Sequence, residues 1–121
     1  MKKLLMAGLF LFLGVFVLTA QNLPSIRIVN NTGYTVDEVC VSPSDSDIWG
    51  ENILEDEILE NGQTFTYQLR YPLSRVSVYD IGMEDENGNI YVKWEVTITN
   101  NVQLVFTIDD LEEEDYYYYY D

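Results

Sequence analysis

The sequence contains no histidine, a single cysteine, and only six basic residues against 21 acids in 121 positions. Without histidine the chain lacks the most frequent general base, the usual zinc ligand and every Ser-His or Cys-His catalytic pair. One cysteine, Cys40, excludes an intramolecular disulfide, and its valine neighbours predict a buried, inert thiol within a strand. No glycine-rich phosphate-binding loop occurs. We therefore expect a protein that is not an enzyme; the catalytic alternative is an acidic hydrolase, although no carboxylate pair stands out.

The first 20 residues have the layout of a secretory signal peptide. Lys2 and Lys3 form a basic start, residues 4–18 are apolar, and Thr19 and Ala20 end the run with small residues. A membrane-spanning helix needs roughly 20 apolar residues, more than this run offers. We expect cleavage after Ala20, a secreted or periplasmic protein, and no membrane span in the mature chain; a retained anchor is the alternative.

Removal of residues 1–20 leaves four basic residues against 21 acids, a net charge of −17. Such a charge repels nucleic acid phosphates and anionic lipid headgroups. The aliphatic and aromatic content is nevertheless too high for a disordered acidic chain. We expect a globular acidic protein whose partner is an unknown protein or another component of the cell envelope.

Six short β-rich stretches, separated by turn residues, make up most of the mature chain. They are residues 25–29, 35–41, 64–71, 75–81, 90–99 and 104–108. Asn87-Gly88 suits a two-residue hairpin loop, and a bulge is expected near Gly82. The pattern predicts an all-β fold, a small antiparallel β-sandwich of about six strands spanning residues 21–110, with one long irregular acidic loop.

The clearest alternation of apolar and polar residues lies in the fifth stretch. A period of two places alternate side chains on one face of a strand. We expect one face of this strand to point into the core, with Trp94 buried; its members are Ile90, Val92, Trp94, Val96 and Ile98.

Residues 42–59 form the long loop, which holds Trp49 and could form at most a helical turn or two, within residues 52–59. Its apolar residues are expected to hold it against the sandwich. Loops of this length are usually functional or disordered, so we expect any ligand contact to lie here. Trp49 is expected either to cap one end of the core or to stand exposed as a binding residue.

Two acidic groups could bind a hard cation. The first is Asp45, Asp47 and Glu51, in the long loop; the second, a weaker match, is Asp85 and Asn87 with Asn89, at the hairpin. Alternating carboxylate and amide oxygens suit calcium, whereas Asp and Asn in turns also satisfy local backbone groups. A calcium-binding or calcium-stabilised secreted module is therefore the alternative to a binding or structural module of the envelope.

Several short motifs resemble a family of small secreted bacterial proteins. The family pattern runs NNTG, then SPSxxxxWGxxxL, then YDI, then D-x-(D/N)-G. It is matched here by residues 30–33, 42–54, 79–81 and 85–88, so the resemblance covers nearly the whole mature chain. It implies an exported bacterial β domain and assigns no activity or site. This chain departs from the pattern at Asn89, where an acid is common, and in its tyrosine-rich end.

Residues 111–121 contain an acidic run followed by five tyrosines. Such low-complexity composition, with no aliphatic residue after Leu111, predicts a C-terminal tail outside the domain.

Overall fold

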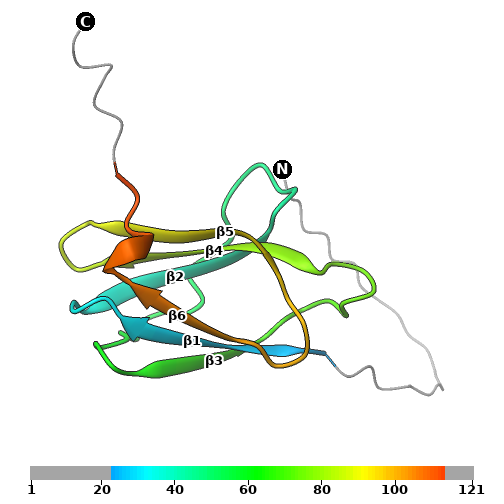
Figure 1. Ribbon diagram of the computed structural model, residues 1–121, viewed down its shortest axis with the longest axis horizontal. Coiled ribbons are helices and arrows are strands. Elements are labelled where there is room, and N and C mark those ends of the chain that lie inside the picture. Colours follow the sequence, from blue (N-terminus) through cyan, green and yellow to red (C-terminus); the bar gives the residue numbers. More distant parts are fainter. Residues whose placement is uncertain (1–22, 114–121) are drawn as a thin grey trace, which may run out of the picture.

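Two three-stranded sheets face each other in the computed structural model, which describes residues 23–113 (Figure 1). The predicted signal peptide and residues 116–120 of the predicted tail lie outside the described residues. The all-β prediction is confirmed. The elements are β1 (Ser25–Asn31), β2 (Val36–Pro43), β3 (Thr64–Gln68), β4 (Val78–Asp85), β5 (Ile90–Thr97), β6 (Gln103–Thr107) and a 3-10 helix, Ile108–Asp110.

The two sheets have different pairing patterns. The β2-β4-β5 sheet is antiparallel throughout, and β4 and β5 form the hairpin predicted at Asn87-Gly88. In the β3-β1-β6 sheet, β1 pairs antiparallel with β3 but parallel with β6, which departs from the expected wholly antiparallel arrangement. The chain crosses from one sheet to the other between β5 and β6, and β6 therefore adds beside β1 rather than beside β5. Within residues 23–113 no helix has the length and apolar character needed to cross a membrane.

The core lies between the sheets and is built mainly from the inward-facing residues of the strands. Its fully buried aromatic side chains are Tyr91 of β5 and Phe106 of β6. The other members are aliphatic, apart from Tyr79 and Met83 of β4, and come from all strands except β3 and from the segments that follow β2, β3 and β5. Neither tryptophan belongs to this set, so the core is complete without the two largest side chains of the chain.

β5 contains a bulge, so the same face of this strand does not point into the core along its whole length. Ile81 pairs with Lys93 and Tyr79 pairs with Val96, so Trp94 and Glu95 together stand opposite the single residue Asp80. Glu95 takes a positive φ of 51° at this point. An extra residue reverses which face the later side chains occupy. Tyr91 points into the core before the bulge, and Ile98 points into it after the bulge.

The prediction that Ile90, Val92 and Trp94 share the core face with Ile98 is therefore wrong. These three residues lie on the outer face of the β2-β4-β5 sheet, where Trp94 is 55% exposed. The bulge expected near Gly82 is thus present opposite Asp80, two residues earlier in β4, and Gly82 itself pairs regularly with Cys40 and Val92.

The loop after β2 runs along the outer edge of that strand. The side-chain oxygen of Asn52 accepts hydrogen bonds from the backbone N–H groups of Val39 (2.9 Å) and Leu54 (3.0 Å), and the N–H of Ile53 donates to the carbonyl of Val39 at 2.8 Å. Leu54 and Leu59 are buried in the core and hold this loop to the sandwich as predicted, whereas Ile48 and Ile58, which were expected to do the same, are exposed. Residues 52–59 form turns rather than a helix.

Residues 108–113 return to the sheet. The 3-10 helix is capped by Thr107, whose hydroxyl accepts from the N–H of Asp109 at 3.1 Å. Leu111 then bridges to Tyr91 and packs against the core, and the N–H of Glu112 donates to the carbonyl of Ile90 at 2.7 Å. The first residues of the predicted tail thus lie along the edge of β5.

Candidate ligand-binding surface

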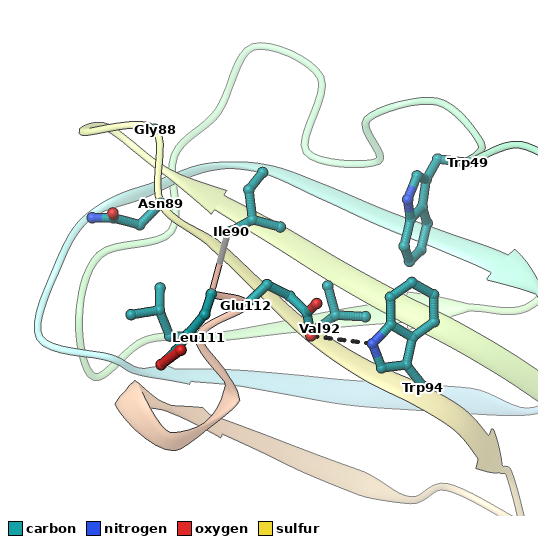
Figure 2. A pocket seen from close by; sticks show the side chains of 9 residues that line it. Trp49, Gly88, Asn89, Ile90, Val92, Trp94, Leu111 and Glu112 are labelled. Carbon is teal, nitrogen blue, oxygen red and sulfur yellow. Dashed lines mark hydrogen bonds between the residues drawn. The ribbon is translucent and has the colours of Figure 1, made fainter. Parts of the chain in front are cut away.

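Trp49 and Trp94 meet on the outer face of the β2-β4-β5 sheet. Their ring centroids are 5.8 Å apart and the ring planes are tilted by 41°. Trp49 is 40% exposed and Trp94 is 55% exposed. Of the two roles expected for Trp49, the exposed position is therefore the observed one. Figure 2 shows the two indoles side by side, one from the loop and one from β5.

Gly82 of β4 provides the surface on which Trp49 rests. A Cβ atom at this position would lie 3.2 Å from the Cη2 atom of the Trp49 ring, closer than ordinary van der Waals contact. Glycine inside a strand commonly marks such a close approach. Its neighbours in the same row of the sheet, Cys40 and Val92, line the space beside the indole.

The backbone next to Trp49 is fixed by the end of β2. The N–H of Gly50 donates to the Ser42 hydroxyl oxygen at 2.7 Å, and the Ser42 side chain is buried. Ser44 continues the β2–β4 pairing, because its N–H donates to the carbonyl of Val78 at 3.0 Å. The loop therefore leaves and rejoins β2 at defined points, and the Trp49 ring is held between them.

Trp94 is positioned by the bulge and by the C-terminal return. The Asp80 carboxylate accepts from the N–H of Glu95 and from the hydroxyl of Ser44, both at 2.8 Å, and so satisfies the bulged backbone. The indole N–H of Trp94 donates to the carboxylate of Glu112 at 3.2 Å, the bond drawn in Figure 2. Because the indole N–H is already bonded, the faces of the ring are what Trp94 offers to a ligand.

Three shallow grooves meet at Trp49. The largest, about 640 Å³, runs along β5 past Trp94 to the hairpin and is closed on one side by Leu111, Glu112 and Glu113. The second, about 540 Å³, lies at the end of the sandwich among Tyr67, Tyr71 and Tyr79. The third, about 280 Å³, crosses the sheet beside Cys40, Glu38 and Glu84.

Acids and burial determine the electrostatics beside Trp49. Burial raises the pKa of Glu84, and the neighbouring carboxylates of Glu38, Asp37 and Asp85 raise it further. The pKa of the Cys40 thiol is raised by burial and by the same Glu38 and Glu84, so the thiol stays protonated. Cys40 lies in β2 as predicted but is only partly buried, and a protonated thiol is a poor nucleophile.

The structure does not bring the predicted calcium ligands together. Among residues 23–113, no three His, Cys, Asp or Glu side chains are grouped so that they could hold a metal ion. Asp45 and Asp47 are exposed in the loop, and Glu51 forms an exposed ion pair with Arg70 at 3.0 Å. The calcium hypothesis stays a prediction without support from this geometry.

Asp85 has a structural role at the hairpin. Its side chain is 1% exposed and accepts from the backbone N–H groups of Asn87 and Asn89, from the Asn89 side chain, and from the Tyr91 hydroxyl at 2.8 Å. Burial acts to raise the pKa of Asp85, but these hydrogen bonds together lower it. Burial and the bond to Asp85 raise the pKa of Tyr91 to about 12. The carboxylate therefore organises the turn in the charged form.

Sequence reasoning identified Trp49 but missed Trp94 and Gly82 as parts of this surface. A regular alternation conceals a bulge, because the extra residue in β5 is not distinguished by its type. Gly82 was a usable signal, since glycine in a strand marks either a bulge or a close approach, and here it marks the latter.

Comparison of the chain with protein-family models, with curated proteins and with solved structures finds no match. The resemblance to a family of small secreted bacterial proteins accordingly stays a hypothesis. Any functional conclusion has to come from the surface itself.

Proposed function

We propose that this protein is an exported, non-enzymatic binding module of the cell envelope, and that it holds its ligand on the outer face of the β2-β4-β5 sheet, against Trp49 and Trp94. The signal-like residues 1–20 support export, and the absence of histidine from the sequence supports binding rather than catalysis. The observation that carries the proposal is the exposed pair of indoles, 5.8 Å apart.

The position of the pair argues against a purely structural role. Burying a large aromatic side chain is among the strongest contributions to the stability of a small domain. This domain instead leaves both of its tryptophans half exposed and fills its core with smaller side chains. Ile90 and Val92 extend the apolar surface along β5 beside the indoles. A contiguous apolar patch with a polar rim is typical of an interaction site.

The test is a binding survey with two variants in which one tryptophan is replaced by alanine. Basic, acidic and neutral peptides and neutral oligosaccharides are titrated into the protein while tryptophan fluorescence and amide chemical shifts are followed. Trp49→Ala and Trp94→Ala should each weaken binding by about 2 kcal/mol, the scale of a tryptophan hot spot. Tyr34→Ala is the matched control, because Tyr34 is an exposed aromatic residue that lines none of the three grooves. Binding that is unchanged in both tryptophan-to-alanine variants, or no binding by any probe, would contradict the proposal.

A further inference from the structure

The charged residues that line two of the three grooves beside the indoles all carry the same sign; the second groove also holds Arg70, which is paired with Glu51. The groove along β5 is lined by Glu112 and Glu113, and the groove across the sheet is lined by Glu38 and Glu84. Neither groove has a lysine or arginine among the described residues that line it. Lys93, the basic residue next to Trp94 in β5, points to the other face, where it pairs with Asp110 at 3.1 Å.

The indoles favour the same sign of ligand. The face of an indole ring carries negative electrostatic potential, and a cation within about 6 Å of the ring centre is attracted to it. The indole N–H of Trp94, the positive edge of that ring, is already bonded to Glu112. Ring faces and carboxylates thus combine on one surface, and both attract positive charge.

The same charge argues against other occupants. A second copy of this chain would bring its own acids to the interface, and the full sequence has a net charge of −15. Anionic membranes and nucleic acids are repelled for the same reason. A neutral sugar could stack on an indole, but it would leave the four glutamates without a counter-charge.

Resting on the proposed function above, we propose that the occupant is a basic segment of another protein, with an arginine or lysine side chain lying against Trp49 and Trp94 and flanked by Glu84 and Glu112. Arginine suits the surface better than lysine. Its planar guanidinium group can stack on an indole while its N–H groups, which lie in the plane, reach carboxylates at the edge. The groove from Trp94 to Ile90 spans five residues of β5, about 13 Å at the usual rise of a strand, which is long enough for several residues of an extended peptide.

The experiment compares two peptides that differ only in charge. One has four Gly-Arg repeats, and in the other citrulline, which is neutral and nearly isosteric, replaces each arginine. Both are titrated into the purified protein at 0.15 M salt, where surface charges are screened beyond about 8 Å. We expect the arginine peptide to bind, and the citrulline peptide to bind at least tenfold more weakly.

The tryptophan variants separate a specific site from diffuse attraction to an acidic protein. Trp49→Ala and Trp94→Ala leave the net charge unchanged, and each should weaken binding of the arginine peptide roughly 2-fold to 30-fold, the range of a cation–π contact. Glu84→Gln and Glu112→Gln should weaken it as well. Glu60→Gln, which removes the same charge at an exposed residue lining none of the grooves, should have a smaller effect.

Each other result has a defined meaning. Arginine-peptide binding that is unchanged in both tryptophan variants would overturn this inference and show diffuse attraction only. Binding of a neutral oligosaccharide but not of the arginine peptide, with loss in Trp94→Ala, would overturn the basic ligand and leave the proposed function standing. If light scattering shows that the protein is a dimer and that Trp94→Ala is a monomer, the occupant of the surface is a second copy of the chain, and the basic ligand is overturned. Failure of both peptides to bind would also overturn the inference.

Discussion

The ring of Trp49 lies directly over Gly82, with its Cη2 atom 3.2 Å from the point where a Cβ would stand. A residue of the loop and a residue of β4 thereby determine the shape of the outer face together. The Trp49 ring can rest on the sheet because the strand beneath it has no side chain at this position.

The first prediction is that Gly82→Val lifts the Trp49 ring from the sheet. In a Trp94→Phe background Trp49 is the sole tryptophan, so its emission should shift to the red as the ring becomes more exposed. The free energy of unfolding should change by no more than about 1 kcal/mol, since glycine inside a strand is itself unfavourable by about that amount. As a control, Gly82→Val in a Trp49→Ala background should be neutral or stabilising, because valine suits a strand. An unchanged emission maximum would show that the ring does not rest on Gly82.

The second prediction contrasts two aromatic residues of β5. Trp94 is 55% exposed, so Trp94→Ala should lower the free energy of unfolding by less than about 1 kcal/mol, as expected for a surface substitution. Tyr91 is 0% exposed, and Tyr91→Ala should cost about 3–5 kcal/mol. Urea denaturation of the two variants measures both values. A larger loss for Trp94→Ala than for Tyr91→Ala would contradict the bulged register of β5.

The third prediction concerns stability in acid and in alkali. The folded protein lowers the pKa of Asp85, so the stabilisation from this carboxylate is present above its unfolded pKa of about 3.9 and is lost as the pH falls through the folded value. Asp85→Asn should lower the free energy of unfolding by about 1.5–3 kcal/mol at neutral pH, the scale of hydrogen bonds to a charged group. It should also weaken the dependence of stability on pH in the acid range.

At the alkaline end the sign is reversed. Folding raises the pKa of Tyr91 to about 12, so stability from its protonated hydroxyl is present below the unfolded pKa of about 10 and is lost as the pH rises through 12. Tyr91→Phe should remove this loss of stability at alkaline pH. The midpoint of urea unfolding, measured across the pH range, checks both predictions. If it changes with pH equally in the variants and in the parent protein, this would argue against the Asp85–Tyr91 bond.

The fourth prediction concerns Tyr79, whose hydroxyl is buried and has no hydrogen-bond partner among the described residues. A buried polar group without a partner costs about 1–3 kcal/mol. Tyr79→Phe should therefore leave the midpoint of thermal unfolding unchanged or raise it. A clear decrease would mean that the hydroxyl makes a bond in solution.

The fifth prediction places the end of the domain. Truncation after Glu113 should leave stability unchanged. Truncation after Asp110 should lower the free energy of unfolding by about 1–2 kcal/mol, because it removes the packing of Leu111 and the backbone bond from Glu112 to Ile90. Thermal unfolding of the two shortened proteins measures the difference. Equal stability of the two shortened proteins would show that Leu111 belongs to the tail, as the sequence predicted.

The sequence by itself determined the all-β class, the approximate positions of the strands other than β4, which begins and ends later than the predicted 75–81, and the Asn87-Gly88 hairpin, because period-two alternation and turn residues are local properties of the chain. It also determined the acidic charge and the attachment of the long loop through apolar residues such as Leu54 and Leu59. Only the tertiary structure decided which face of β5 points inward, since the bulge at Glu95 depends on hydrogen bonds to Asp80, a residue of another strand. The meeting of Trp49 with Trp94 was likewise decided by packing, because the two residues are 45 positions apart and come together only when the Trp49 ring lies over Gly82.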